Sequence, residues 1–236
     1  MEKTIDLKSP KDSFLAGHKI EDRILYPGTG YAVLAWRNYE EIHGHAPQST
    51  PIVITNLVLK RATMLSEERP TTLFSTLLTG SGQFEFKNGA EVIVSGNISL
   101  LEDTMTTGKP DESLLSSDSN QQHMLKGSSS SWLPLNAEDI YKELRLRGYN
   151  YSGPFKGIQR VDNEGRWAEI VWKDNWISFL DTMIQASIIT ITDARTLSLP
   201  VEIERISIDP NDFFRHLKTT AAETGGASVS TQNCCC

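Results

Sequence analysis

The sequence predicts an α+β chain built from two similar halves, and three observations carry this prediction. Each half contains one long segment whose apolar residues recur at helical spacing. Several short runs in each half have the apolar and polar alternation of strands with one buried face. Between the halves, residues 103–131 are rich in Ser, Asp, Gly and Gln. This stretch has few large apolar side chains to offset its ordering entropy, so we expect a flexible linker.

The first half, residues 1–102, predicts one helix followed by antiparallel strands. Pro27 is a favourable first helical residue, and the helical spacing continues to Gly44. The predicted strands are 52–60, 71–79, 83–86 and 91–100. The last two are joined by "KNGA", whose Asn88-Gly89 pair favours a type I′ hairpin.

The second half, residues 132–217, repeats this arrangement. A short helix is expected between Asn136, a plausible N-cap, and Gly148. A strand pair, 157–162 and 166–172, precedes a long apolar helix from Trp176 to Ile191 and a strand in "LPVEIERISID"; residues 218–236 are expected to be a disordered tail. A helix too apolar for solvent needs a sheet curved around it. Two such units side by side form a double hot-dog, the fold we predict.

Composition excludes several classes of function. The chain has 236 residues and a formal net charge of −7, which argues against a nucleic-acid footprint and against an anionic membrane surface. No secretory signal is visible at the N-terminus, and the longest apolar stretch is shorter than the ~20 residues that a membrane span needs. All three cysteines are terminal, Cys234–Cys236, so the body has no disulfide framework or thiolate metal site. We expect a cytoplasmic protein; the terminal triplet does not fit a prenylation box and suggests a fragment end or gene-model artefact.

His18 is the first candidate catalytic residue. Histidine is the commonest base near neutral pH, and this one precedes the Gly-rich "PGTG" at a helix start. The glycines allow close approach of a substrate, and the first N–H groups of the helix, at Gly28, are free to polarise a carbonyl oxygen. The alternative is a surface or core histidine, which is how we interpret His43, His45, His123 and His216.

Asp181 is the second candidate, on the most apolar helix of the chain. A carboxyl group among Trp, Phe, Leu and Met is costly as an anion, so we expect its pKa to rise, as suits a general acid. Gln185 lies four residues further on the same face and can orient the carboxyl group. The alternative is that Asp181 caps a helix or meets an arginine such as Arg195. Tyr149 and Tyr151 bring phenols beside a Gly-Pro turn, where packing is their commoner role.

These blocks together resemble the dehydratase domain of animal type I fatty acid synthase and, more distantly, that of modular polyketide synthases. The histidine block appears as "HKIEDRILYPG", the Gly-Tyr-x-Tyr block as "GYNYSGPFKGI", the Asp-x-x-x-Gln pair as Asp181 and Gln185, and the Leu-Pro block as "LPVEIERISIDP". The resemblance runs from about residue 5 to residue 209.

The resemblance implies a double hot-dog that dehydrates a (3R)-3-hydroxyacyl thioester on acyl carrier protein to the trans-2-enoyl product, beside other synthase domains. His18 would take the C2 proton, Gly28 N–H would hold the thioester oxygen, and Asp181, oriented by Gln185, would protonate the leaving hydroxyl. Tyr149 would help to bind or orient the substrate. The elimination needs no metal, nucleotide or flavin.

Two departures from the family pattern keep alternatives open. Asp22 stands where the family has a glycine, and a carboxylate there could hold His18 protonated. Gly153-Pro154 lies one place later than usual, with Ser152 in the glycine's position. The alternatives are a catalytically inactive scaffold that binds carrier protein, and another hot-dog thioester enzyme, a thioesterase or an isomerase. Acyl length, oligomeric state and membership of a larger synthase are left open.

Overall fold

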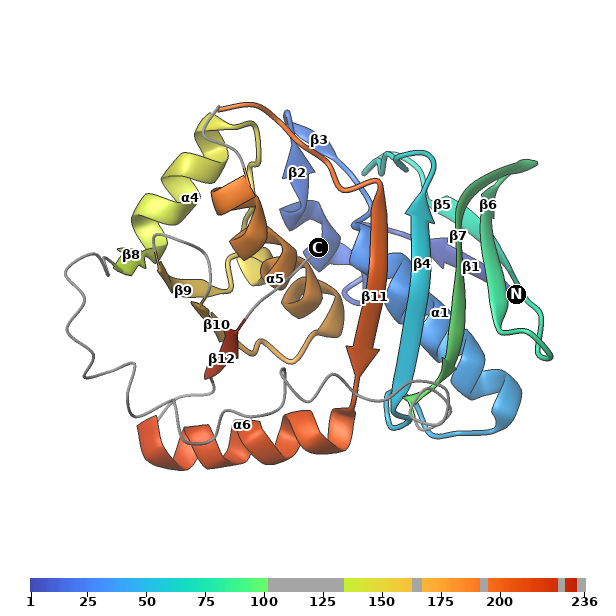
Figure 1. Cartoon of the computed structure of the whole chain (residues 1–236). Helices are drawn as coiled ribbons and strands as arrows, with labels where there is room; N and C mark the ends of the chain where they lie inside the picture. Colours follow the sequence, from blue (N-terminus) through green and yellow to red (C-terminus); the bar gives the residue numbers. More distant parts are fainter. Residues whose placement is uncertain (102–133, 163–166, 192–194, 225–227, 233–236) are drawn as a thin grey trace.

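Two long helices, α1 (Gly28–His43) and α5 (Trp176–Ile191), lie side by side at the centre of the computed structural model, which describes residues 1–101, 134–162, 167–191, 195–224 and 228–232 (Figure 1). The Trp36 and Trp176 rings meet edge to face at 5.5 Å. Thr29 Oγ1 donates a hydrogen bond to Ile177 O at 3.0 Å. This packing joins the two halves through their most apolar elements, so neither helix is left in water.

The helix bounds follow the sequence signals. α1 begins after Pro27, whose φ of −67° suits a helix start, and ends at Gly44 with a left-handed φ of 70°. In the second half, α4 (Ala137–Leu146) begins at Asn136, whose Oδ1 accepts from Asp139 N at 3.0 Å. The predicted cap at Asn136 is confirmed, whereas Pro27, predicted as the first helical residue, is the extended N-cap of α1, one residue before the helix begins.

A larger antiparallel sheet wraps around α1. Its strand order is β1-β5-β6-β7-β4-β11. The strands are β1 (Glu2–Ile5), β5 (Thr71–Leu77), β6 (Gln83–Asn88), β7 (Glu91–Leu100), β4 (Ile52–Leu59) and β11 (Glu202–Ile208). The β6–β7 hairpin differs in turn type from the prediction. Asn88 pairs with Glu91 and only Gly89 has a positive φ, 62°, which is the pattern of a type II′ turn rather than type I′.

The second half forms a smaller sheet beside α5. Its order is β12-β10-β9-β8, all antiparallel. The strands are β12 (Ser228–Gln232), β10 (Trp167–Val171), β9 (Ile158–Asp162) and β8 (Pro134–Asn136). Each half therefore has a long helix and an antiparallel sheet, which confirms the predicted fold class.

One strand crosses between the halves. β11 comes from the second half of the sequence, yet its residues pair antiparallel with β4 in the first sheet, for example Ile206 with Ile54. Val201 O also accepts from Leu59 N at 2.7 Å. The sequence places this strand in the second half, whereas the structure places it at an edge of the first sheet, because hydrophobic alternation shows that a strand exists but not which edge it joins.

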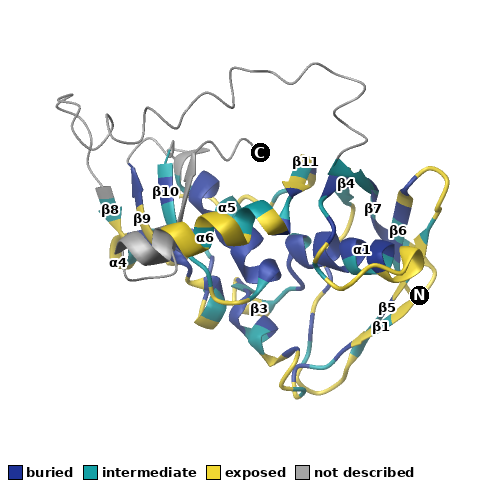
Figure 2. Cartoon of the chain, turned by 90° about the horizontal axis from the view of Figure 1, so that it is seen from below, coloured by how far each residue is buried: buried dark blue, intermediate teal, exposed yellow. Residues whose placement is uncertain are grey.

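The predicted tail also differs from the structure. α6 (Pro210–Thr224) continues past residue 218, and β12 pairs with β10. Figure 2 shows α1 and α5 largely buried, whereas α6 has exposed residues on the outside. α6 is held by Phe213, whose ring lies 4.9 Å from Trp172 and 4.7 Å from Trp176. Contacts between aromatic residues that are far apart in the sequence hold α6 in place, although the small polar residues of this segment favour disorder.

Some predictions lie outside the described residues: the linker 103–131, the connection between the predicted strands 157–162 and 166–172, His123 and Cys234–Cys236. Over the described part of the chain, no helix is both long and apolar enough to cross a membrane. The remaining short elements are η1 (Ser13–Gly17), β2 (Lys19–Ile20), β3 (Arg23–Ile24) and η3 (Gly153–Phe155).

Candidate active site

His18 is held on a short segment that is clamped between the two halves. It follows η1 and precedes β2. The backbone of this segment is hydrogen-bonded to the Gly-Tyr-x-Tyr segment of the second half: Ser152 N to Gly17 O at 2.9 Å, Asn150 N to Lys19 O at 2.8 Å, and Glu21 N to Gly148 O at 2.8 Å. These backbone hydrogen bonds therefore place His18 next to the second half.

The ring of His18 is oriented by a backbone carbonyl. Its Nδ1 lies 2.8 Å from Leu25 O. A carbonyl can only accept, so Nδ1 carries a hydrogen and, in the neutral ring, Nε2 is left as the basic nitrogen. The aromatic rings of Tyr151 and Phe155, at 5.5 and 5.2 Å, fix the ring from the sides. His18 thus presents one free lone pair in a defined direction.

Asp181 lies opposite this nitrogen. His18 Nε2 and Asp181 Oδ1 are 3.5 Å apart, and both side chains are buried. Burial alone would lower the pKa of His18, but the negative charge and hydrogen bonding of Asp181, with the Leu25 carbonyl, raise it above its usual 6.5. The two groups thus face each other across a short gap, where a base and an acid can reach the same substrate.

Gln185 fixes the other oxygen of Asp181. Its Nε2 donates to Asp181 Oδ2 at 2.8 Å and to Phe155 O at 3.0 Å. One turn of α5 separates the two residues, so the helix itself sets the distance. The hydrogen bond to Asp181 is thus present, and the orienting role of Gln185 in catalysis stays a prediction.

Tyr141 belongs to the same network, although the sequence does not single it out. Its hydroxyl lies 3.3 Å from both Gln185 Oε1 and Phe155 O and accepts from Ile158 N at 3.0 Å. In the sequence Tyr141 lies among the apolar residues of a short amphipathic helix, where a tyrosine is ordinarily expected to pack in the core. Only the structure shows its hydroxyl beneath Gln185.

A cavity of about 240 Å³ opens beside the pair. Its lining includes His18 and Asp181, and most of its other side chains are apolar, such as Ile20, Leu25, Leu59, Ile184 and Ile188. Gly28, the first residue of α1, lines it too, and its N–H is among those with no partner inside the helix. A Cβ at this position would lie 2.7 Å from Leu59 Cδ1, so glycine keeps the backbone accessible there.

The Leu-Pro block and Tyr149 also reach this cavity. Leu199, Pro200 and Val201 line it. The ring of Tyr149 lines it as well, but its hydroxyl is hydrogen-bonded to Ser198 O and accepts from Ser198 N at 2.9 Å. Tyr149 therefore anchors the segment that precedes β11, and contact of its ring with substrate stays a prediction.

Asp22 does not face the base. Glu21 and Asp22, with φ of 46° and 62°, are the two central residues of the β2–β3 turn, the pattern of a type I′ hairpin. Asp22 is exposed and its Oδ1 accepts from Asn150 Nδ2 at 2.8 Å. Glycine adopts a left-handed backbone without steric strain, and aspartate tolerates this conformation. The replacement of the family's glycine by Asp22 therefore affects the turn and not the charge around His18.

The other candidates take structural roles. Arg195 is exposed and pairs with Glu143 Oε2 at 3.2 Å, not with Asp181. The rings of His43 and Tyr39 stack at 4.1 Å, and His45 Nδ1 meets Thr50 Oγ1 at 3.0 Å. Among the described residues, no group of three or more His, Cys, Asp and Glu is placed to hold a metal ion.

Comparison with known sequences points to one family. Residues 3–89 match the model of the polyketide synthase dehydratase domain. The hybrid PKS-NRPS synthetase apdA of Emericella nidulans is 23% identical over 251 residues, covering 93% of this chain and 6% of the synthetase. The lovastatin nonaketide synthase, polyketide synthase component, of Aspergillus terreus is 28% identical over 172 residues, covering 65% of this chain and 6% of the synthase. The chain thus spans a small part of these relatives.

Solved structures share the fold. The dehydratase domain of the CurF module of curacin polyketide synthase superposes with a TM-score of 0.66 at 18% identity, over 88% of this chain and 76% of that domain. The PpsC dehydratase domain of Mycobacterium tuberculosis, in complex with C12:1-CoA, gives 0.57 at 18% identity, over 80% and 67%. The sequence relatives are polyketide synthases and do not single out animal fatty acid synthase. The chain is thus similar to polyketide synthase dehydratase domains and has their double hot-dog fold.

Proposed function

We propose that the chain dehydrates a (3R)-3-hydroxyacyl thioester, carried by the phosphopantetheine arm of an acyl carrier protein, to the trans-2-enoyl thioester. The observation that carries this proposal is the position of His18 Nε2, 3.5 Å from Asp181 Oδ1, on the wall of a largely apolar cavity. A base and an acid at this separation can act on two adjacent carbon atoms of one substrate.

The elimination balances with these two groups alone. His18 Nε2 takes the proton from C2, which the thioester carbonyl acidifies, and the electrons of that C–H bond form the C2–C3 double bond. The C3–O bond breaks as Asp181 gives its proton to the departing hydroxyl, which leaves as water. His18 is then protonated and Asp181 ionised, and transfer of one proton between them restores the starting state.

The surrounding residues serve this chemistry. The Nδ1–H bond to Leu25 O keeps the lone pair of His18 on Nε2, and Gln185 holds Asp181 Oδ2 so that Oδ1 faces the cavity. The N–H of Gly28 at the start of α1 is proposed to hold the thioester oxygen as negative charge develops. The apolar lining suits an acyl chain and keeps water from the reacting atoms.

The comparisons support the reaction class. Two variants of the CurK dehydratase, one with histidine replaced by phenylalanine and one with aspartate replaced by asparagine, are described as inactive. These are the two residue types that we place in catalysis. The relatives suggest a polyketide synthase as the parent assembly; a fatty acid synthase, as the sequence motifs suggest, presents the same kind of substrate. We further propose a cytoplasmic location because the folded body contains no cysteine.

The direct test is dehydration of a 3-hydroxybutyryl thioester, followed by the absorbance of the enoyl product. We expect turnover by the intact chain and a loss of at least about 100-fold in both His18→Ala and Asp181→Asn, the usual scale for removing a general base or acid. His216→Ala, an exposed histidine on α6, is the matched control and should keep full activity. A folded parent without turnover would favour the inactive scaffold, and release of free thiol would indicate a thioesterase.

A further inference from the structure

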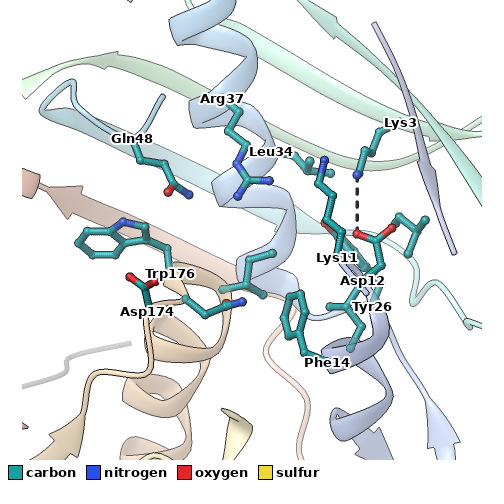
Figure 3. Close-up of a pocket in the computed structure, with 14 residues that line it drawn as sticks. Lys3, Lys11, Asp12, Phe14, Tyr26, Leu34, Arg37, Gln48, Asp174 and Trp176 are labelled. Atoms are coloured by element: carbon teal, nitrogen blue, oxygen red, sulfur yellow. Dashed lines mark ion pairs between the residues drawn. The ribbon is translucent and has the colours of Figure 1, made fainter. Parts of the chain in front are cut away.

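A second cavity, of about 110 Å³, lies on the other side of Tyr26 from the reaction cavity, and this tyrosine lines both. Three cationic side chains from separate segments line it. Lys3 comes from β1, Lys11 from the loop before η1, and Arg37 from the middle of α1 (Figure 3). The chain as a whole has a net charge of −7, so a gathering of cations around a cavity is a local exception that needs a reason.

The positive charges are only partly compensated. Lys3 Nζ lies 3.7 Å from Asp12 Oδ1, and Asp12 Oδ2 also accepts from Asp6 N at 3.1 Å. The other carboxylate on the lining is Asp174, which leaves one net positive charge. Burial lowers the pKa of Lys3, Asp12 opposes this, and the nearby charges of Lys11 and Arg37 lower the pKa further.

Arg37 is the central residue of this cavity. It is half-buried, and within the described part of the chain its guanidinium has neither a hydrogen bond nor an ion pair. Figure 3 shows it extending from α1 into the space between Gln48 and Lys11. A guanidinium offers five N–H donors in a planar fork that matches oxyanions, and a partly desolvated one without a partner is costly.

The start of α5 adds to the positive potential. Asn175, Trp176 and Ile177 line the same cavity, and α5 begins at Trp176. The first N–H groups of a helix carry partial positive charge, and α5 has 16 residues, long enough for this effect. The Oδ1 atom of Asn175 accepts from Ser178 N at 3.0 Å, three residues into the first turn. The three cationic side chains and the start of α5 therefore line the same small cavity, although they belong to different elements.

We propose that this cavity binds the phosphate group of a small ligand. A tetrahedral oxyanion would accept hydrogen bonds from Arg37 and Lys11, lessen the repulsion among the cations, and face the start of α5. The same group could come from free inorganic phosphate or from a phosphorylated organic arm that continues past Tyr26 towards the reaction cavity. The site is independent of the proposed dehydration, because its test does not depend on turnover.

The experiment is thermal unfolding of the intact chain titrated with sodium phosphate, with sodium chloride at matched ionic strength as the reference. We expect Tm to rise by about 3–5 °C when phosphate is tenfold above its Kd. Arg37→Gln and Lys11→Gln should each abolish this rise. Lys8→Gln removes the same charge from an exposed residue outside the cavity and should keep it. Lys11 is itself exposed, so its variant tests the site even if Arg37→Gln fails to fold.

Two further ligands distinguish the sources. If the natural ligand is an organic phosphate arm, 4′-phosphopantetheine should bind at least tenfold more tightly than inorganic phosphate, and pantetheine without the phosphate should bind much more weakly. Equal Kd values for both phosphates would assign the site to a free anion. A Tm rise no larger than that given by chloride, or one that persists in both cavity variants, would overturn the proposal.

Discussion

The Nε2 atom of His18 and the Oδ1 atom of Asp181 lie 3.5 Å apart, although the residues belong to opposite halves of the chain. His18 gains a charge partner that its own half does not supply, and its pKa is raised despite burial. The separation therefore depends on how α5 packs against the first half. The proposed catalysis and the packing of the two halves are therefore expected to depend on each other through this pair.

Asp181→Asn should lower the pKa of His18, because burial, the largest influence, then acts without the opposing charge. The measurement is NMR titration of the ring Cε1–H signal of His18, assigned with His18→Ala. The raised folded-state pKa also makes a stability contribution that is fully present below about pH 6.5 and lost as pH rises through the folded pKa. The unfolding free energy of the parent minus that of Asp181→Asn should therefore fall as pH rises through the folded pKa of His18. A difference that does not change with pH, or a His18 pKa that is the same in both proteins, would contradict the coupling of His18 with Asp181.

Tyr141→Phe should lower kcat by about tenfold with little change in KM, since a positioning residue affects the reacting groups rather than binding. Its hydroxyl contacts Gln185, Phe155 and Ile158, and the variant leaves the buried Ile158 N–H without its acceptor. We expect a loss of about 1–3 kcal/mol in unfolding free energy. Tyr39→Phe, another buried tyrosine outside the cavity lining, is the control for stability loss alone; an equal fall in kcat there would refute a positioning role.

Asp22→Gly should leave kcat within about twofold of the parent, because Asp22 is exposed and bonded to Asn150 rather than aimed at His18. The unfolding free energy should change by less than about 1 kcal/mol, as relief of the left-handed φ of 62° is offset by the lost hydrogen bond and the greater freedom of glycine in the unfolded chain. Steady-state kinetics and urea unfolding check both. A large gain in activity would show that the carboxylate does act on the base.

Gly17→Ala should be severely damaging, because a Cβ there would lie 2.4 Å from Ser152 O. The backbone pairing that holds His18 against the second half would have to open, and we expect a loss of more than about 2 kcal/mol together with most of the activity. Gly80→Ala is the matched control, since nothing lies within 4 Å of its added Cβ. Circular dichroism during urea unfolding, with the enoyl assay on each variant, separates lost folding from lost alignment.

Much of the fold can be predicted from the sequence because its signals are local. The helical spacing from Trp176 to Ile191 coincides with α5, and Pro27 and Gly44 bound α1. The chemistry of His18 and Asp181 is suggested by residue type and environment. The sequence does not predict three contacts between distant residues: the pairing of β11 with β4, the hydrogen bond of Asp22 with Asn150, and the contact of the Tyr141 hydroxyl with Gln185. Periodicity gives the face of an element, whereas its partners depend on packing between residues far apart in the chain.

The place of β11 has a consequence for the chain while it is being made. β4 is complete once residue 59 has left the ribosome, and β7 follows soon for one of its edges, but β11, the partner for the other edge, begins only at residue 202. At ~5–20 residues per second, that edge of the first sheet stays open for on the order of ten seconds. An open edge is a template for pairing with another nascent chain. Slow or interrupted translation between residues 59 and 202 should therefore favour aggregation, and a holding chaperone on the emerging first half would protect the yield.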